Sequence, residues 1–280
     1  MQTLNCHGQL IDLTIPKVMG IINVTPDSFY DGGKTFSEKN ILKQAEKMLL
    51  DGAAFLDIGG YSTRPGAEDI SEKEETDRVI KAVETVINEF PEALISIDTF
   101  RNKVAEKAVL AGAALVNDVS GGTLDVDMYK TVAELKVPYI MMHMRGTPKT
   151  MTKLTAYTDV TLEVLKDLSE KLALARAAGI NDIIADPGFG FAKTREQSFA
   201  LLNNLELFKN LDIPLLVGVS RKSFIYKTLE TTAENALNGT TALNVMALMK
   251  GASILRVHDV KEAVECVKLW SEVVGIAIKE

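Results

Sequence analysis

In the stretch IIADPGFGF, residues 183–191, a short apolar run ends on a carboxylate and continues into a glycine-rich turn. The same order recurs in GIINVTPDSF (20–29), LDIGGYSTRPG (56–66), ISIDTF (95–100), LVNDVSGG (115–122), IMMHM (140–144), LLVGVSRKSF (215–224) and ILRVHDV (254–260). Apolar runs of this length are typical of parallel strands that are buried on both faces. Eight of them, separated by helix-length stretches, predict an α/β fold, a (β/α)8 barrel with a polar pocket at the C-terminal ends of its strands.

The expected elements follow this alternation. We expect strands at 18–24, 55–58, 94–97, 115–116, 139–142, 183–185, 215–219 and 254–257. We expect a first helix that begins near Ser37 and carries apolar residues as far as Leu49, and a second helix at the SEKEE stretch (71–75) with apolar positions from Val79 to Ile87. Further helices are expected near 102–111, 125–136, 159–178, 196–209, 235–250 and 260–278. Ser37 would cap the first helix, Ser71 with Glu74 would form a capping box, and Gly179 would end the fifth helix. A hairpin within 2–18, turning at His7-Gly8, would close the barrel bottom. We expect one domain, residues 1–280.

The composition limits the classes of function. The chain has 280 residues, of which 46% are apolar, and its 31 basic and 38 acidic side chains give a net charge of −7. An acidic chain argues against general nucleic-acid binding, although a few local cations can still hold an anionic substrate. Cys6 and Cys266 are too far apart for a zinc or redox motif. With no apolar run near the roughly 18 residues of a membrane span and no signal-peptide pattern, we expect a cytoplasmic protein without membrane contact.

Three polar side chains end strands of the predicted barrel and would converge on one rim. Asp98, Asn117 and Asp186 follow the third, fourth and sixth strands. A carboxylate at such a position cannot stay unpaired without a cost of several kcal/mol. Its partners are either protein groups, such as backbone amides or a lysine, or a flat heterocycle rich in N–H donors. Met142, which is otherwise core filler, is a candidate for the lining of the same pocket.

Cations follow the last two strands. The loops after these strands form the common phosphate site of such barrels, so Arg256 and His258 are candidates for gripping a phosphate. Lys222 either joins them or reaches inward to Asp186, and Arg221 is either part of this group or a solvated rim charge.

Other candidates lie near long loops. Asn23, at the end of the first strand, is either a magnesium ligand shared with a diphosphate or a turn-forming residue. His143 is either a base at the rim or a buried structural histidine. The loops 25–37, 59–72 and 143–156 follow strands and are long enough to be functional, and the Gly and Pro residues of the first two suit segments that close over a substrate.

Seven motifs occur in order along the chain: MGIINVTPDSFYDGG (19–33), DIGGYSTRPGAE (57–68), ISIDTFR (95–101), NDVSGG (117–122), DPGFGFAKT (186–194), VSRKSF (219–224) and RVHDV (256–260). With them the chain resembles the dihydropteroate synthase family of pterin-binding barrels. The resemblance implies that 6-hydroxymethyl-7,8-dihydropterin diphosphate condenses with 4-aminobenzoate to give 7,8-dihydropteroate and diphosphate, with Mg²⁺ as cofactor. It also implies sulfonamides as inhibitors and a homodimer formed through the last helices.

The resemblance also assigns roles to residues, none of them covalent. The residues that would bind the pterin are Asp98, Asn117, Asp186 and Lys222. Those that would hold the diphosphate are Asn23, Arg64, Arg256 and His258, with Mg²⁺ at Asn23. Those that would border the aminobenzoate are Thr63, Pro65, Phe191, Lys222 and Ser223. The catalytic set would be Asp98, Lys222, Arg64 and Asp27, the last two on mobile loops. Tyr61 departs from the acidic residue of many bacterial members, and Tyr30 departs from the usual Ser.

Two other functions compete with this one. Methyltetrahydrofolate:corrinoid methyltransferases share the barrel and the pterin-holding Asp and Asn residues, but a methyl transfer releases no diphosphate and leaves the cationic motifs unexplained. A non-catalytic pterin-binding barrel should have lost charges at the rim, yet Arg64, Lys222, Arg256 and His258 are all present.

Overall fold

The computed structural model describes residues 2–24, 34–62 and 69–277. Within these residues, eight parallel strands stand side by side in a barrel, with β10 paired to β3 and each strand from β3 to β8 paired to the next. The barrel strands are β3 (Lys17–Asn23), β4 (Phe55–Gly59), β5 (Ile95–Asp98), β6 (Leu115–Asp118), β7 (Tyr139–Met142), β8 (Ile183–Asp186), β9 (Leu216–Val217) and β10 (Ile254–Val257). β9 pairs with β10, and a bridge between Ala185 and Leu215 nearly closes the ring.

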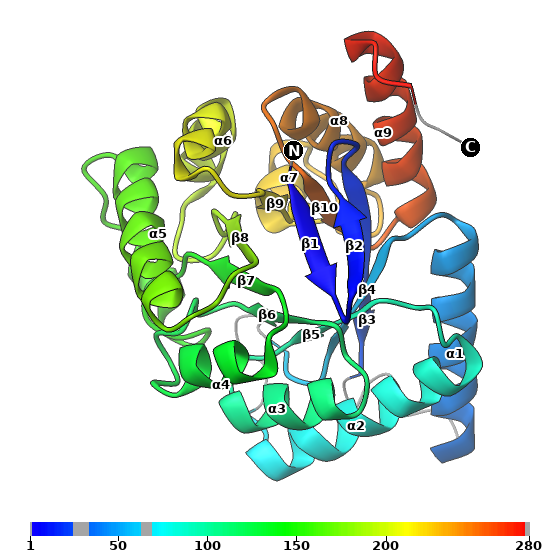
Figure 1. The fold of residues 1–280 in the computed structure, drawn as a ribbon. Helices are drawn as coiled ribbons and strands as arrows, with labels where there is room; N and C mark the ends of the chain where they lie inside the picture. Colours follow the sequence, from blue (N-terminus) through cyan, green and yellow to red (C-terminus); the bar gives the residue numbers. More distant parts are fainter. Residues whose placement is uncertain (1, 25–33, 63–68, 278–280) are drawn as a thin grey trace.

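Helices surround this barrel (Figure 1). They are α1 (Lys34–Leu50), α2 (Glu72–Glu89), α3 (Asn102–Leu110), α4 (Met128–Leu135), α5 (Val160–Ala177), α6 (Arg195–Asn203), α7 (Ser223–Thr228), α8 (Leu237–Met249) and α9 (Val260–Val274), with 3-10 segments η2 (Met151–Lys153) and η3 (Leu205–Leu211). Strands and helices alternate along the chain, which confirms the predicted (β/α)8 barrel. No helix of the described ranges is long and apolar enough to cross a membrane.

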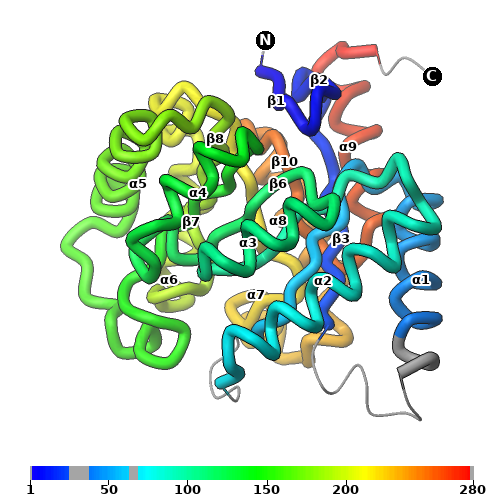
Figure 2. Tube along the Cα trace, turned by 60° about the horizontal axis from the view of Figure 1, so that its bottom comes forward, coloured from blue at the N-terminus to red at the C-terminus, as the bar shows by residue number. Residues whose placement is uncertain are grey.

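The N-terminal hairpin closes one end of the barrel, as predicted. Strands β1 (Thr3–Cys6) and β2 (Gln9–Asp12) are antiparallel and turn at His7 and Gly8, whose φ angles are 51° and 86°. Two positive φ angles are what the tight hairpin turn that matches strand twist requires. Leu4 is buried in a cluster with Phe55 and Leu115, the first residues of β4 and β6. Figure 2 shows the hairpin at one end and α7 toward the other.

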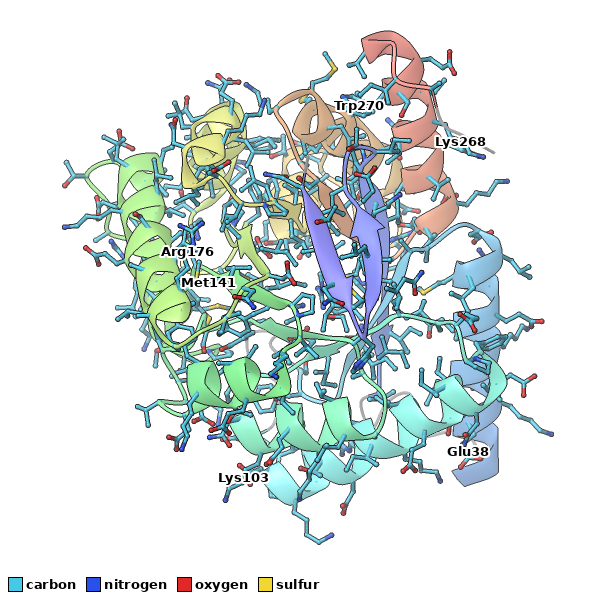
Figure 3. The ribbon with its side chains drawn as sticks, viewed as in Figure 1. Glu38, Lys103, Met141, Arg176, Lys268 and Trp270 are labelled. Carbon is cyan, nitrogen blue, oxygen red and sulfur yellow. The ribbon has the colours of Figure 1, made fainter. Side chains whose placement is uncertain are left out.

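The described side chains are buried or exposed according to their positions in the alternating strands and helices. Figure 3 shows Met141 of β7 inside the ring of helices, where it is fully buried, while Lys103, Arg176 and Lys268 extend from exposed helix positions. The main apolar core lies between the outer faces of the strands and the helices, and a second cluster fills the barrel beneath the hairpin. The two clusters leave the C-terminal ends of the strands for polar side chains.

Three details of the predicted elements were wrong. α1 begins at Lys34, so Ser37 lies inside the helix and does not cap it. The helix expected at 196–209 divides into α6 and η3, because Leu205, Phe208 and Leu211 are buried three residues apart, and a 3-10 helix presents every third residue on one face. The seventh strand is shortened to Leu216–Val217, and the six-residue α7 after it was not expected, since so short a helix has no readable period.

Candidate active site

A cavity of about 590 Å³ opens at the C-terminal end of the barrel. Seven of the residues to which the resemblance assigns a role line it: Asn23, Asp98, Phe191, Lys222, Ser223, Arg256 and His258. They come from the ends of β3, β5 and β10, from the turn after β8 and from the start of α7. Functional side chains at this end and stability at the other are the usual division of labour in such barrels.

Arg256 lies at the centre of the polar network. Its Nε is 2.6 Å from Oδ2 of Asp57, and its Nη2 is 2.7 Å from Oδ2 of Asp98. Asn117 donates from Nδ2 to the same oxygen of Asp57, at 3.0 Å. The arginine of β10 therefore bridges the carboxylates of β4 and β5. From the sequence we predicted that Arg256 binds a phosphate at the rim. In the structure, two of its nitrogens bind carboxylates.

The charged groups in this network shift one another's pKa values. Burial raises the pKa of Asp98 to about 7, although the Arg256 guanidinium opposes the shift and Asp57 adds to it. Burial works against the charge of Arg256, but Asp57 and Asp98 outweigh it and raise the pKa of the guanidinium further. Arg256 is therefore a permanent cation, whereas Asp98 can exchange its proton near neutral pH.

Lys222 contacts the turn that follows β8. It precedes α7, and its Nζ donates to the carbonyl of Phe189 and lies 4.6 Å from the centroid of the Phe191 ring. Burial lowers the pKa of Lys222 to about 8, while the carboxylate of Asp186 holds it up. The lysine thus remains mostly charged at neutral pH and balances Asp186.

Asn117, Asp186 and Met142 are buried near the cavity but do not line it. One oxygen of Asp186 accepts from the backbone N–H of Gly188 at 2.7 Å, so a protein group satisfies part of this carboxylate. Burial raises its pKa, and Lys222 opposes that shift. Met142 packs in a small apolar cluster with Met144 and Met151.

The rim holds two further arrangements. The hydroxyl of Ser220 lies 3.0 Å from Nδ1 of His258 and accepts from the backbone N–H of the same residue at 3.1 Å. Arg221 is not a solvated charge, since it forms two 2.8 Å hydrogen bonds with Asp259.

Asn23 lies at the exposed end of β3, in the cavity lining. Across the described ranges, no group of three or more His, Cys, Asp or Glu residues is arranged to hold a metal ion. A hard oxygen from one amide suits Mg²⁺, which keeps several waters and takes oxygens from a phosphate. The residues present therefore fit a magnesium ion that binds together with a diphosphate.

Some predicted site residues lie outside the described part of the chain, and one residue of the site was not predicted. Asp27, Thr63 and Arg64, together with Tyr30 and Pro65, lie outside the described residues. Asp57 was missed, although its signal was present as a carboxylate in the apolar run of β4. His143 is buried, and burial together with the charge of Lys193 lowers its pKa to about 2, which supports the structural interpretation of this histidine.

Comparisons with known proteins agree with this geometry. A parallel barrel with converging charges at its C-terminal end defines the chain as a barrel enzyme, and residues 19–258 match the model of the pterin binding enzyme family. Relatives include the dihydropteroate synthases of Escherichia coli K12 (42% identical over 268 residues, 95% of this chain and 94% of the relative) and Synechocystis (47% over 255 residues, 90% and 88%). The chain belongs to the pterin binding enzymes and, among them, to the dihydropteroate synthases.

Solved structures show the same likeness. The Xanthomonas albilineans dihydropteroate synthase with 4-aminobenzoic acid superposes with a TM-score of 0.91 at 38% identity, covering 98% of this chain and 99% of that one. The Yersinia pestis enzyme with a sulfonamide drug gives 0.91 at 39% identity, covering 98% and 100%. These likenesses do not favour the corrinoid methyltransferase alternative.

Proposed function

We propose that this protein condenses 6-hydroxymethyl-7,8-dihydropterin diphosphate with 4-aminobenzoate, with the residue roles set out below. One observation carries the proposal: the cavity joins a carboxylate network, Asp57–Arg256–Asp98, to the Lys222–Phe191 contact and to His258 at the rim. A structure of the Xanthomonas albilineans enzyme contains 7,8-dihydropteroate, and one of the Thermus thermophilus enzyme contains 4-aminobenzoate, which supports the same substrates here.

The pterin is proposed to lie against Asp98, with Asn117, Asp186 and Lys222 completing its hydrogen bonds. Breaking the carbon–oxygen bond at the methylene of the pterin develops positive charge on the ring and negative charge on the departing diphosphate. A fixed carboxylate beside the ring stabilises the first of these charges, which makes Asp98 the principal electrostatic residue. Met142 would contact the ring edge from below.

The diphosphate is proposed to bind at the rim. Arg256 has Nη1 outside its two ion pairs, and His258 lines the same cavity. Asn23 would hold a Mg²⁺ ion that neutralises part of the diphosphate charge. Arg64 and Asp27 are proposed to complete this half of the site from their loops.

The aminobenzoate is proposed to lie between Phe191, Lys222 and Ser223, next to Thr63. Its amine is a weak base whose nitrogen lone pair is available for attack, so no general base is required.

We also propose a homodimer that buries the outer faces of α8 and α9. These neighbouring helices expose large apolar side chains: Val245, Met246, Met249, Leu269, Val273 and Val274. A contiguous apolar patch on a surface marks an interaction site, and a symmetric pair of such patches closes a dimer. Sedimentation equilibrium tests this proposal, because Met249→Glu should shift the protein to monomer, whereas Leu110→Glu, on the exposed face of α3, should not.

The reaction itself is tested by product analysis. Purified protein with Mg²⁺, the pterin diphosphate and 4-aminobenzoate should yield 7,8-dihydropteroate, identified by mass spectrometry, together with one equivalent of diphosphate. Leaving out the aminobenzoate is the control. Diphosphate release of equal rate without aminobenzoate would refute the condensation.

A further inference from the structure

Lys193 is a buried lysine at the end of the turn that follows β8. Its residue is 8% exposed, and its Nζ donates to the carbonyl oxygens of Gly188, at 2.9 Å, and Phe191, at 3.0 Å. The same nitrogen shares a hydrogen bond with Nδ1 of His143, at 2.8 Å. All three partners are uncharged: two are backbone carbonyls, and burial holds His143 neutral. Burying a lysine side chain costs free energy, so its surroundings must offset that cost.

The turn that Lys193 contacts has an unfavourable backbone. Gly188, Gly190 and Ala192 have φ angles of 71°, 75° and 49°. An L-residue such as Ala192 in this region costs roughly 1–2 kcal/mol, so surrounding contacts must hold it there. Lys193 supplies them, since its nitrogen joins both ends of the turn, at Gly188 and Phe191, to the histidine after β7.

This turn carries part of the cavity wall. The ring of Phe191 lines the cavity 4.6 Å from the Lys222 nitrogen, and the carbonyl of Phe189 accepts a hydrogen bond from that nitrogen. Asp186, by contrast, is fixed by the barrel itself, since it pairs with Met142 in the sheet and its carbonyl accepts from His143 N at 2.9 Å. A loosened turn would therefore move Phe189 and Phe191 and leave Asp186 in place.

We propose that Lys193, seated on His143, is a positioning residue for the aminobenzoate half of the site. It holds both ends of the 188–191 turn, at Gly188 and Phe191, so that the Phe191 ring keeps its place in the cavity wall. This inference rests on the proposed function and deepens it, because it assigns the turn to one of the two substrates.

The test replaces Lys193 by Met, which keeps the stem of the side chain and removes its hydrogen bonds. The KM for 4-aminobenzoate should rise about tenfold or more, as a loss near 1.4 kcal/mol would cause. The Kd for the pterin diphosphate, measured by calorimetry without aminobenzoate, should change less than about threefold. Lys171→Met is the control, because Lys171 is also buried, binds carbonyls of Ser120 and Met142 and pairs with Asp167, but lies on α5 outside the cavity lining. It should lower the melting temperature and leave both constants near those of the wild type.

A second pair of variants serves if Lys193→Met does not fold. His143→Gln keeps an acceptor for the lysine and should retain the wild-type KM for aminobenzoate, whereas His143→Leu should raise it. A folded Lys193→Met protein with unchanged KM, or with equal losses for both substrates, would overturn the inference, and so would equal KM values for His143→Gln and His143→Leu. A wild-type protein that forms no product would instead refute the proposed function, so the two failures are distinguishable.

Discussion

At the scale of single residues, Arg256 and the carboxylates around it set the electrostatics of the cavity. Asp57 is fully buried and binds both Arg256 and Asn117. Asp98 binds Arg256 and also lines the cavity. Arg256 contacts only Oδ2 of Asp98, so a pterin that donated hydrogen bonds to this carboxylate would share it with the arginine.

The stability of the protein should depend on pH through Asp98. Its pKa is about 7 in the folded protein against an ordinary value of 3.8, so between these values the folded state holds a proton that the unfolded state has released. Stability from this group is therefore greatest below the lower value and falls as the pH rises to about 7. Asp98→Asn should make that fall smaller, as measured by urea unfolding at about pH 4 and about pH 8. Burial also raises the pKa of Asp118 and Asp186, so part of the fall should remain. An identical fall in the variant and the wild type would show that Asp98 titrates normally.

Asp57→Asn should destabilise the protein. Removing one partner of a buried ion pair costs about 3–5 kcal/mol, and because the Arg256 side chain is 21% exposed we expect roughly 2–3 kcal/mol. Urea denaturation measures this loss. Asp69→Asn is the control, because Asp69 pairs with Lys149 on the surface, where both side chains are more than half exposed and the pair contributes little. Equal losses for the two variants would contradict the importance of burial.

At the scale of elements, the turn after β8 shows how local backbone geometry positions the site. Gly188 and Gly190 both have positive φ angles, but their surroundings differ. A β-carbon at Gly188 would lie 2.1 Å from the carbonyl oxygen of His143, whereas one at Gly190 would meet Cδ of Lys222 at an ordinary 3.5 Å. Only at Gly188 does a backbone atom block the space that a β-carbon would need.

Gly188→Ala should therefore be much more disruptive than Gly190→Ala. Both substitutions carry the strain of a left-handed L-residue, roughly 1–2 kcal/mol, but Gly188→Ala adds a clash that only a backbone shift relieves. Thermal unfolding of the two variants, side by side, measures the difference. Similar melting temperatures would mean that the turn is not held against His143.

The elements that could be predicted from the sequence are those with a strong repeating pattern. The apolar runs of β3 to β8 and β10 and the Ser71 cap of α2 were readable, and the structure places Ser71 Oγ 3.2 Å from the Glu74 N–H. The capping box at Thr194 and Gln197 was overlooked. The contacts of Asp57 and Lys193 could not be predicted, because their partners are 199 and 50 residues away and only the closed barrel brings them together.

At the scale of the whole molecule, the barrel separates stability from chemistry. Figure 2 shows the hairpin at one end of the barrel and α7 toward the other. The second apolar cluster lies beneath the hairpin, and the cavity lies at the C-terminal ends of the strands. Changes at the first end should alter the free energy of unfolding without altering substrate affinity.

Leu4→Ala tests this separation. Leu4 is 1% exposed beneath the hairpin, so its truncation should cost about 2–5 kcal/mol by urea denaturation, with KM values unchanged for both substrates. Leu10→Ala, at a hairpin position that is 70% exposed, should change neither property. A rise in KM for Leu4→Ala under folding conditions would mean that the two ends are coupled.

The central claim is that carboxylates deep in the cavity hold the pterin while cations at its mouth hold the diphosphate. Calorimetric titration of Arg256→Ala with two ligands, the pterin diphosphate and the same pterin without phosphates, tests it most directly. In this variant the Kd for the diphosphate should rise more than about tenfold, while the Kd for the bare pterin should rise much less, because only the diphosphate loses a cation that binds it. Equal weakening of both ligands would contradict it.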